Sequence, residues 1–423
     1  MNFLDLNVTK RINDALLEFG YTEATDIQEK AIPAILEGKD VLASAQTGTG
    51  KTAAFAIPML QNIHKSKKTK GRRKIKGLII SPTRELAQQI YDNYKVYSKY
   101  LNIKIGVIYG GVSQKRQEKF LHNGVDVVIS TPGRLMDLMN QGFVDLRFVE
   151  TFVLDEADRL LDMGFIHDIK KIVKPIPEDR QTLLFSATLP KSVMNVAKEI
   201  MRDPIRIAAA RVSSPVEKIK QTLYYVDPDN KKKLLVDIIQ EGLNDTVLVF
   251  ARTKNNTERI VKYLEKNNIT ARAIHGDKSQ NKRRKTLNDF KNYKFQVLVG
   301  TDVASRGLDI DALSCVVNYN IPEEAETFIH RIGRTGRAGE EGRAIAFCDY
   351  GERGLLKDIE KLMDFEIEVV EDHPYPLLDK SVKPPRSGGG RKKGGRGRRR
   401  RSKRGGQKSY KGKKNKRSKK RSR

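Results

Sequence analysis

The amino-acid sequence predicts two α/β units in tandem, each a parallel sheet covered by helices, followed by a disordered basic tail. Three observations support this fold class. Short apolar runs typical of strands alternate with segments of helical periodicity. The alternation is interrupted at residues 209–217 and then starts again. From residue 380 onward, the Gly-, Arg-, Lys- and Ser-rich composition cannot supply a hydrophobic core.

The first unit is expected over residues 1–208. Its first 38 residues have helical periodicity, and helices are expected to begin again at Lys51, Arg84 and Arg134. Between them lie apolar runs that predict strands at 41–43, 78–80, 127–129, 152–154 and 183–185. Alternation of strand and helix favours a parallel sheet, because parallel neighbours need a long crossover connection.

The second unit is expected over residues 218–379, after a linker at 209–217. Helices are predicted near 256–266 and 280–290, between strands at 246–250, 271–274, 296–299, 316–319 and 344–347. Each unit has the usual size of a domain. The remaining segment, 380–423, is predicted to be the disordered tail.

The charge of the chain is concentrated in that tail. The formal net charge is +29, and residues 380–423 contain 23 Lys and Arg residues but no Asp or Glu. This density predicts a polyanionic partner, above all a nucleic acid, bound through its phosphates. A solvating tail or a nuclear-targeting signal would have a similar composition.

Cysteine usage and the absence of apolar spans predict a cytoplasmic protein without a membrane partner. Cys315 and Cys348 lie in strand-like apolar runs, which favours buried free thiols over a disulfide and hence a reducing compartment. The cysteines and histidines lack the spacing of metal ligands. The sequence shows neither a signal-peptide pattern nor an apolar run long enough to span a bilayer.

A phosphate-binding loop is predicted between the first strand and the helix from Lys51. Its glycines let backbone N–H groups point at phosphate oxygens, next to the positive end of the helix dipole. Lys51 would reach the β- and γ-phosphates, and Thr52 would bind Mg²⁺. The general pattern begins with Gly, where this chain has Ala; a chance Gly-rich turn is the alternative. The loop residues are Ala45, Gln46, Thr47, Gly48, Thr49, Gly50, Lys51 and Thr52.

Three acids follow the predicted strand 152–154. In an open α/β sheet, ligands bind at the carboxyl ends of the strands. A solvated acidic turn is the alternative, but a phosphate loop in the same unit favours a site. Asp155 would then hold Mg²⁺ partly through water, and Glu156 would orient and deprotonate the attacking water. Asp158 completes the cluster, and the combination predicts nucleotide hydrolysis.

Both motifs resemble those of the DEAD-box ATP-dependent RNA helicases. The resemblance extends in family order from residue 3 to about residue 340, and the short core with a basic tail resembles bacterial members. Its other motifs are Pro82-Thr83-Arg84-Glu85-Leu86-Ala87, Gly110-Gly111, Thr131-Pro132-Gly133-Arg134, Ser186-Ala187-Thr188, Val249-Phe250-Ala251-Arg252, Thr301-Asp302-Val303-Ala304-Ser305-Arg306-Gly307-Leu308-Asp309 and His330-Arg331-Ile332-Gly333-Arg334-Thr335-Gly336-Arg337.

The resemblance implies two RecA-like domains with ATP between them and RNA across both. It also implies that Arg334 and Arg337 are arginine fingers, and that Asp309 contacts the ATP ribose. The adenine-recognition motif would consist of Phe3, Tyr21, Thr25 and Gln28. Ala24 and Asp26 stand where prolines are common in the family, which leaves the strictness of adenine selection open.

Further roles follow from the same resemblance. Residues that couple hydrolysis to unwinding would be Asp158, Ser186, Thr188 and His330. Thr131 and Pro132 also suit the start of a helix, with Thr131 as its cap. Small, hydroxyl and guanidinium groups suit sugar and phosphate, so RNA binding should be largely independent of sequence. The RNA-contact candidates are Thr83, Arg84, Gly111, Thr131, Gly133, Arg134, Arg252, Gln280, Arg283 and Thr301.

The function expected is an ATP- and Mg²⁺-dependent RNA helicase that unwinds RNA duplexes or remodels ribonucleoproteins. Two alternatives remain at this point: an ATP-gated RNA clamp without productive unwinding, and a DNA translocase. Ribosomal or mRNA-decay proteins are conceivable partners. Ribosome biogenesis, decay and cold adaptation all remain open as pathways.

Overall fold

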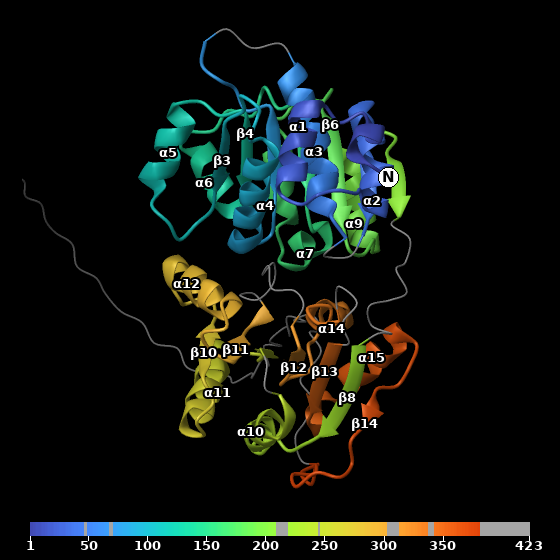
Figure 1. The fold of residues 1–423 in the computed structure, drawn as a ribbon, viewed down its shortest axis with the longest axis vertical. Coiled ribbons are helices and arrows are strands. Elements are labelled where there is room, and N and C mark those ends of the chain that lie inside the picture. The colour runs from blue at the N-terminus through green and yellow to red at the C-terminus, as the bar shows by residue number, and fades with distance from the viewer. Residues whose placement is uncertain are drawn as a thin grey trace, which may run out of the picture. The chain divides into compact units, whose positions relative to one another are not determined.

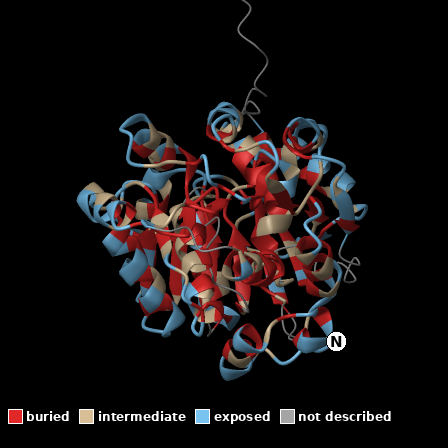
Figure 2. Ribbon diagram, turned by 90° about the horizontal axis from the view of Figure 1, so that it is seen from above, coloured by how far each residue is buried: buried red, intermediate tan, exposed pale blue. Residues whose placement is uncertain are grey.

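The computed structural model describes residues 1–45, 49–66, 71–208, 219–243, 246–302, 313–336 and 342–380. Strands of the described residues form two sheets, and both belong to one compact unit, Met1–Pro384. Figure 1 shows the helices and strands of each sheet. Figure 2 shows that the buried residues are concentrated in the strands and on the helix faces turned toward them.

The first sheet has seven parallel strands in the order β3-β4-β2-β5-β6-β1-β7. Its inner strands are apolar and buried on both faces, as expected when helices cover a parallel sheet. The strands are β1 Val41–Ser44, β2 Gly77–Ile80, β3 Ile105–Ile108, β4 Val127–Ser130, β5 Thr151–Leu154, β6 Gln181–Ser186 and β7 Ile205–Ala208.

Two helical layers cover this sheet, because successive strand residues point to opposite faces. Val153 packs with the first layer and Leu154 with the second. The first layer contains η1 Phe3–Leu6, α1 Lys10–Glu18, α2 Asp26–Leu36, α3 Lys51–Lys65 and α4 Arg84–Tyr97. The second contains α5 Gln114–His122, α6 Pro132–Asn140, α7 Ala157–Asp162, α8 Ile166–Val173 and α9 Lys191–Ile200.

The second sheet repeats the topology of the first. Its order is β10-β11-β9-β12-β13-β8-β14, which is the order of the first sheet with seven added to each number. The strands are β8 Ile219–Tyr225, β9 Val247–Phe250, β10 Ala271–Ile274, β11 Val297–Gly300, β12 Cys315–Asn318, β13 Gly342–Cys348 and β14 Glu368–Val369. The helices are α10 Lys231–Gly242, α11 Lys254–Lys266, α12 Gln280–Lys291, α14 Ala325–Ile332, η3 Tyr350–Glu352 and α15 Arg353–Met363.

The structure confirms the expected strands and adds four that the sequence did not predict: β3, β7, β8 and β14. The fold class of two parallel sheets covered by helices is therefore confirmed. Residues 209–217 and 381–423 lie outside the described residues, so the domain bounds stay predictions. Cys315 and Cys348 are buried free thiols, as predicted. In the described ranges, every helix is too short or too polar to cross a bilayer.

Candidate nucleotide and RNA site

The phosphate loop starts at the carboxyl end of β1 and ends in the first two residues of α3. Gly50 precedes the helix with φ +89°, a conformation that glycine adopts without steric cost. A Cβ at this position would also overlap the side-chain amide of Gln28. Ala45 and Thr49 to Thr52 are described, whereas Gln46, Thr47 and Gly48 lie outside the described residues.

Lys51, the lysine of the phosphate loop, is buried. Lys51 is 7% exposed, and its Nζ has no hydrogen-bond partner in the described part of the chain. Its charge favours the ionised forms of Asp155, Glu156 and Asp158. An ammonium group buried without a bonded partner is costly unless an anion compensates it. The arrangement is therefore suited to an anionic ligand.

Asp155 follows β5 directly and is 3% exposed. Burial, with a smaller contribution from the neighbouring Glu156, raises the pKa of Asp155 to about 7 against the opposing charge of Lys51. The carboxylate accepts a hydrogen bond from the backbone N–H of Glu156, at 3.0 Å. A buried carboxylate of this kind is the type of group that a cation stabilises.

Glu156 has left-handed backbone geometry, with φ 52° and ψ 53°. This region costs a non-glycine residue about 1–2 kcal/mol, so the surrounding structure must enforce it. Burial opposes ionisation of Glu156, but Arg159, Lys51, Arg334 and His330 outweigh it and lower its pKa. Arg159 is bonded directly to Glu156, with Nη1 2.7 Å from Glu156 Oε2.

Asp158 links the acid cluster to the carboxyl end of β6. Its Oδ2 accepts hydrogen bonds from the backbone N–H groups of Ala187 and Thr188, at 3.1 and 2.8 Å, and from the Thr188 hydroxyl at 3.0 Å. Ser186 Oγ accepts from the backbone N–H of Asp158, at 3.1 Å. Burial raises the pKa of Asp158, but the Thr188 bonds and nearby cations lower it overall. The sequence predicted these three residues as coupling groups, and the structure places them in one hydrogen-bond network.

The adenine-recognition candidates are connected to the phosphate loop. Thr25 Oγ1 donates to the carbonyl of Thr49 at 2.8 Å, and Gln28 Nε2 donates to that of Gly50 at 3.1 Å. Gln28 Oε1 also accepts from the Thr25 backbone N–H at 3.0 Å, in a capping box that starts α2. These bonds connect the start of α2 to the phosphate loop.

Two aromatic candidates of that motif differ in exposure. Tyr21 is partly exposed and meets Tyr97 edge-on, with ring centroids 5.7 Å apart. Phe3 is 0% exposed and packs in the core of the first layer. The apolar side of η1 is turned into the core, and a direct contact between Phe3 and the nucleotide stays a prediction.

The RNA-contact candidates of the first sheet lie at the carboxyl ends of β2, β3 and β4. Arg84 starts α4, and its guanidinium lies against Gly111, where a Cβ would overlap it. Thr83 caps α4 by accepting from the Leu86 N–H at 3.2 Å. A Cβ built on Gly133 has open space around it. These groups meet at one sheet edge, as parallel strands require.

The start of α6 contains two of the predicted groups, Thr131 and Arg134. Thr131 stands at the N-cap position before Pro132, but its side chain makes no capping hydrogen bond. The sequence prediction of Thr131 as a capping group is therefore wrong for the side chain; Pro132 alone provides the favourable first turn. Arg134 lies near Asp137, with Nε 3.5 Å from its carboxylate.

Most candidates of the second sheet are engaged by acids that the sequence analysis had not singled out. Gln280 Nε2 and Arg283 Nη2 both bond Glu85 Oε1, at 2.9 and 3.0 Å. Arg252 Nη2 bonds Glu352 Oε1 at 2.8 Å. Thr301 follows β11 directly and is partly exposed. The partners were missed because Glu85 lies 195 residues from Gln280, so that only the tertiary fold relates them.

The segment after β12 contains the finger candidates. Arg334 is 4% exposed and lowers the pKa of Glu156. Burial, together with the charge of Arg159, lowers the pKa of His330 to about 3. Arg331, which sequence analysis left without a role, bonds both oxygens of Asp302 at 2.7 Å. Arg337 and Asp309 lie outside the described residues.

A phosphate loop after β1, its lysine, and acids after β5 at the same edge of the sheet define a nucleotide hydrolase of the P-loop class on tandem RecA-like sheets. Two family models match the chain: the DEAD/DEAH box helicase model over residues 25–196, and the helicase conserved C-terminal domain over 230–339.

Curated relatives are similar over most of their length. An ATP-dependent RNA helicase CshA from Limosilactobacillus reuteri is 42% identical over 366 residues, 86% of this chain and 72% of the relative. A DEAD-box ATP-dependent RNA helicase RhpA from Helicobacter pylori is 41% identical over 370 residues, which are 88% of this chain and 74% of the relative. The chain belongs to the DEAD-box family of ATP-dependent RNA helicases.

Solved structures agree with this assignment. Mss116p bound to single-stranded RNA and AMP-PNP matches with a TM-score of 0.79 at 31% identity, covering 88% of this chain and 79% of the other. Dbp5 of S. cerevisiae bound to RNA and ADP-BeF3 matches with a TM-score of 0.78 at 29% identity, covering 87% and 95%. The protein is thus an RNA-stimulated ATPase and an ATP-dependent RNA helicase.

Proposed function

We propose that Lys51, Thr52, Asp155 and Glu156 carry the ATPase reaction of this helicase. The observation that carries the proposal is the buried ammonium group of Lys51, which has no bonded partner in the described ranges and acts electrostatically on the three carboxylates after β5. A triphosphate would supply the missing anion, and the start of α3 would add backbone N–H groups.

The residues present also fit Mg²⁺. No cluster of three or more His, Cys, Asp or Glu side chains suited to a metal occurs among the residues that the structure describes. One buried carboxylate, Asp155, and one hydroxyl, Thr52, are instead a sparse oxygen donor set. Mg²⁺ commonly binds in this way, completing its shell with water and substrate phosphates. When bound, the ion would neutralise charge on the phosphate oxygens.

Glu156 is proposed as the base that orients the attacking water. Its pKa is lowered by Arg159 and Lys51 against the effect of burial, so the carboxylate stays ionised at neutral pH. Its bond to Arg159, at 2.7 Å, holds the carboxylate in position. Arg334, and Arg337 outside the described residues, would stabilise charge on the transferred phosphoryl group.

Asp158, Ser186, Thr188 and His330 are proposed to couple hydrolysis to RNA unwinding. A change in the position of Asp158 would be transmitted to the end of β6 through three hydrogen bonds at its Oδ2. These bonds to a charged acceptor are individually strong. In this proposal, the network is the mechanical link between the acids and the strand end.

RNA is proposed to lie along the carboxyl ends of β2, β3 and β4, with its counterpart surface on the second sheet. Arg84, Thr83 and Gly133 present groups suited to phosphate and sugar, which predicts weak dependence on base sequence. In this proposal, Gln280 and Arg283 would exchange Glu85 for RNA. The proposed tail, 380–423, would tether RNA by its charge.

The proposal extends to cellular context. We place the protein in the cytoplasm, in agreement with its two reduced cysteines, with roles in ribosome biogenesis or mRNA decay and protein partners from those pathways. Crosslinking the protein to RNA in cells and sequencing the RNA tests this placement. Recovery of neither ribosomal RNA nor mRNA would contradict it.

The decisive experiment for the site is Glu156→Gln. It should retain ATP binding and abolish turnover, because glutamine fills the same space without acting as a base. Near-normal turnover would refute the role of Glu156. Strand displacement of a short RNA duplex separates helicase from clamp, and ATPase stimulation by matched RNA and DNA strands separates helicase from DNA translocase.

A further inference from the structure

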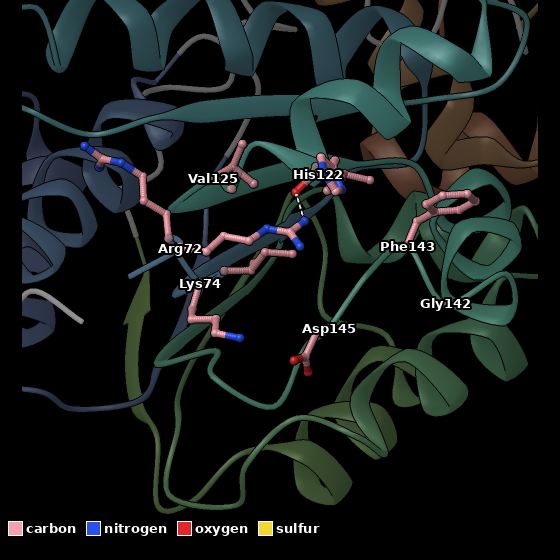
Figure 3. A pocket seen from close by; sticks show the side chains of 11 residues that line it. Arg72, Lys74, His122, Val125, Gly142, Phe143 and Asp145 are labelled. Carbon is pink, nitrogen blue, oxygen red and sulfur yellow. Dashed lines mark hydrogen bonds between the residues drawn. The ribbon is translucent and has the colours of Figure 1, made fainter. Parts of the chain in front are cut away.

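A basic pocket lies on the first sheet away from the catalytic edge (Figure 3). It has a volume of about 210 Å³ and is lined by Arg72, Lys74, His122, Val125, Phe143 and Asp145 among others. Arg72 and Lys74 precede β2, and Val125 precedes β4, so the pocket lies at the amino ends of these strands. The RNA-contact candidates lie at the carboxyl ends, about 13 Å away for strands of this length.

The segment before β2 is unusually basic. Residues 65–76 contain eight Lys and Arg residues and no acid. Two of the described ones are paired within the fold: Arg73 with Asp126, and Lys76 with Glu150. Arg72 and Lys74 form no ion pair with any residue that the structure describes; Arg72 donates only to the Leu121 carbonyl, at 2.5 Å. Two positive charges are thus left for an external anion.

The one carboxylate on the pocket wall is already compensated. Asp145 accepts from Arg147 Nε and Nη2, at 2.9 and 3.1 Å. Arg147 and, to a lesser degree, Lys74 lower the pKa of Asp145 despite some burial. Asp145 therefore stays ionised and paired, and it does not cancel the charges of Arg72 and Lys74.

Two exposed aromatic rings accompany these cations. Phe143 is 41% exposed and Phe148 is 40% exposed. Lys74 Nζ lies 4.6 Å from the centroid of the Phe148 ring, a cation–π contact that holds the ammonium group beside a flat apolar surface. A cation next to an exposed ring suits a nucleotide, because the cation can bind the phosphate and the ring can stack on the base.

The backbone of this segment is held in place. Gly124 has φ +79°, and a Cβ there would lie 3.0 Å from the backbone N and O of Arg73. Arg73 donates to the carbonyl and side chain of Asn102, at 3.0 and 2.6 Å. Arg73 is fixed by its bonds and by the close approach of Gly124. Its chain neighbours Arg72 and Lys74 are positioned as a consequence. The pocket is therefore built into the fold.

We propose that this basic pocket is a second RNA-binding site, which takes the phosphodiester backbone of a segment beyond the helicase face. Arg72 and Lys74 would contact phosphates, and Phe143 or Phe148 would stack on a base. The basic tail cannot be the occupant, because its charge has the same sign. An acidic protein would use the cations but not the rings, so the rings favour RNA. A strand leaving the helicase face would thereby be held at both edges of the sheet.

The test uses the full chain with Arg72→Glu and Lys74→Glu combined, and RNA-stimulated ATPase as the readout. One activator is a strand of about 10 nucleotides, a length that one binding face can cover; the other is several times longer. With long RNA at about 0.1 M salt, the half-saturating concentration should rise roughly 5- to 25-fold, and the salt slope should fall by about 1.4 for two lost phosphate contacts. The curves with short RNA should coincide with those of the unaltered protein.

The matched control reverses two exposed lysines on the helices α8 and α9, Lys171→Glu and Lys198→Glu. This control should change neither the short-RNA nor the long-RNA activation curve. Replacing Phe143 and Phe148 by Ala should weaken long-RNA activation at least roughly fivefold without changing the salt slope, because stacking releases no counterions. Ultraviolet crosslinking of long RNA should label the peptide that contains these rings.

Three results would overturn the proposal. In the first, the charge reversal raises the half-saturating concentration of short and long RNA equally. In the second, the lysine control has the same effect as the charge reversal. In the third, the long-RNA curves of the charge-reversed and unaltered proteins coincide. If poly-glutamate binds the unaltered protein but not the charge-reversed one, while the long-RNA curves coincide, the pocket serves an acidic protein instead. Because short RNA reports the helicase face alone, failure here leaves the proposed ATPase site untouched.

Discussion

The ion pair between Arg159 and Glu156 yields the sharpest prediction, which is the substitution Arg159→Met. Both side chains are at most 5% exposed, and their charged atoms lie 2.7 Å apart. Methionine retains the apolar packing of the arginine stem but leaves the carboxylate buried without the cation that bonds it. Removing one partner of a buried pair costs about 3–5 kcal/mol. Because Lys51 and Arg334 also favour the ionised carboxylate, we expect about 3 kcal/mol, the lower end of that range.

Thermal unfolding followed by circular dichroism measures this loss. For a domain of about 200 residues, 3 kcal/mol corresponds to a decrease in Tm of about 6–12 °C. The same substitution in a Glu156→Gln background should cost at least about 1.5 kcal/mol less, because no buried charge is left unpaired. Equal costs in the two backgrounds would show that the pair does not hold Glu156 as argued.

Catalysis offers a second readout of the same change. Arg159→Met should lower kcat by up to about 100-fold, since an unanchored base no longer orients water well, while ATP binding is retained. Arg147→Met is the matched control. Arg147 also pairs with an acid, but its side chain is 76% exposed, so its loss should leave both Tm and kcat unchanged.

Three further predictions concern other residues. Thr188→Val removes one of the three hydrogen bonds that Asp158 Oδ2 accepts, so RNA-stimulated ATPase should persist while strand displacement falls; a parallel loss of both activities would contradict the coupling role. Gln28→Glu replaces the amide that donates to Gly50 and should raise KM for ATP roughly 5- to 100-fold, at about 1–3 kcal/mol for the lost bond; an unchanged KM would exclude Gln28 from nucleotide binding. Burial raises the pKa of Cys315 and Cys348 to about 12, so only about one thiol in 10,000 is ionised at pH 8. A thiol reagent should therefore label both only after denaturation, and rapid labelling of native protein would refute their burial.

The inner strands could be predicted because helices cover both faces, which requires continuous apolar runs such as Val127 to Ile129. The four missed strands lie at or next to an edge of their sheets. Most of β7 is exposed, and β8 alternates between buried and exposed residues. A strand that is half solvated needs no continuous apolar run, so its local sequence resembles that of a loop.

Some residues of the candidate site could likewise be predicted from the sequence, and others could not. The phosphate loop and the acids after β5 are chemical requirements met by consecutive residues, and they could be identified without coordinates. Arg159, Glu85 and Glu352 were missed because each is an ordinary charged residue in its local sequence. Only the fold shows that Glu352 lies 2.8 Å from Arg252, although 100 residues separate them.

The sequence by itself determined the chemistry of this protein: a phosphate loop, acids at a strand end, and basic groups for RNA. The tertiary structure alone decided which charges are buried together, that Glu156 is held by Arg159, and that Arg72 and Lys74 remain unpaired among the described residues beside exposed rings. The physical reason is that residue type and local spacing specify which groups can react. Desolvation and charge pairing depend instead on distances through space, which arise only when segments far apart in the chain pack together.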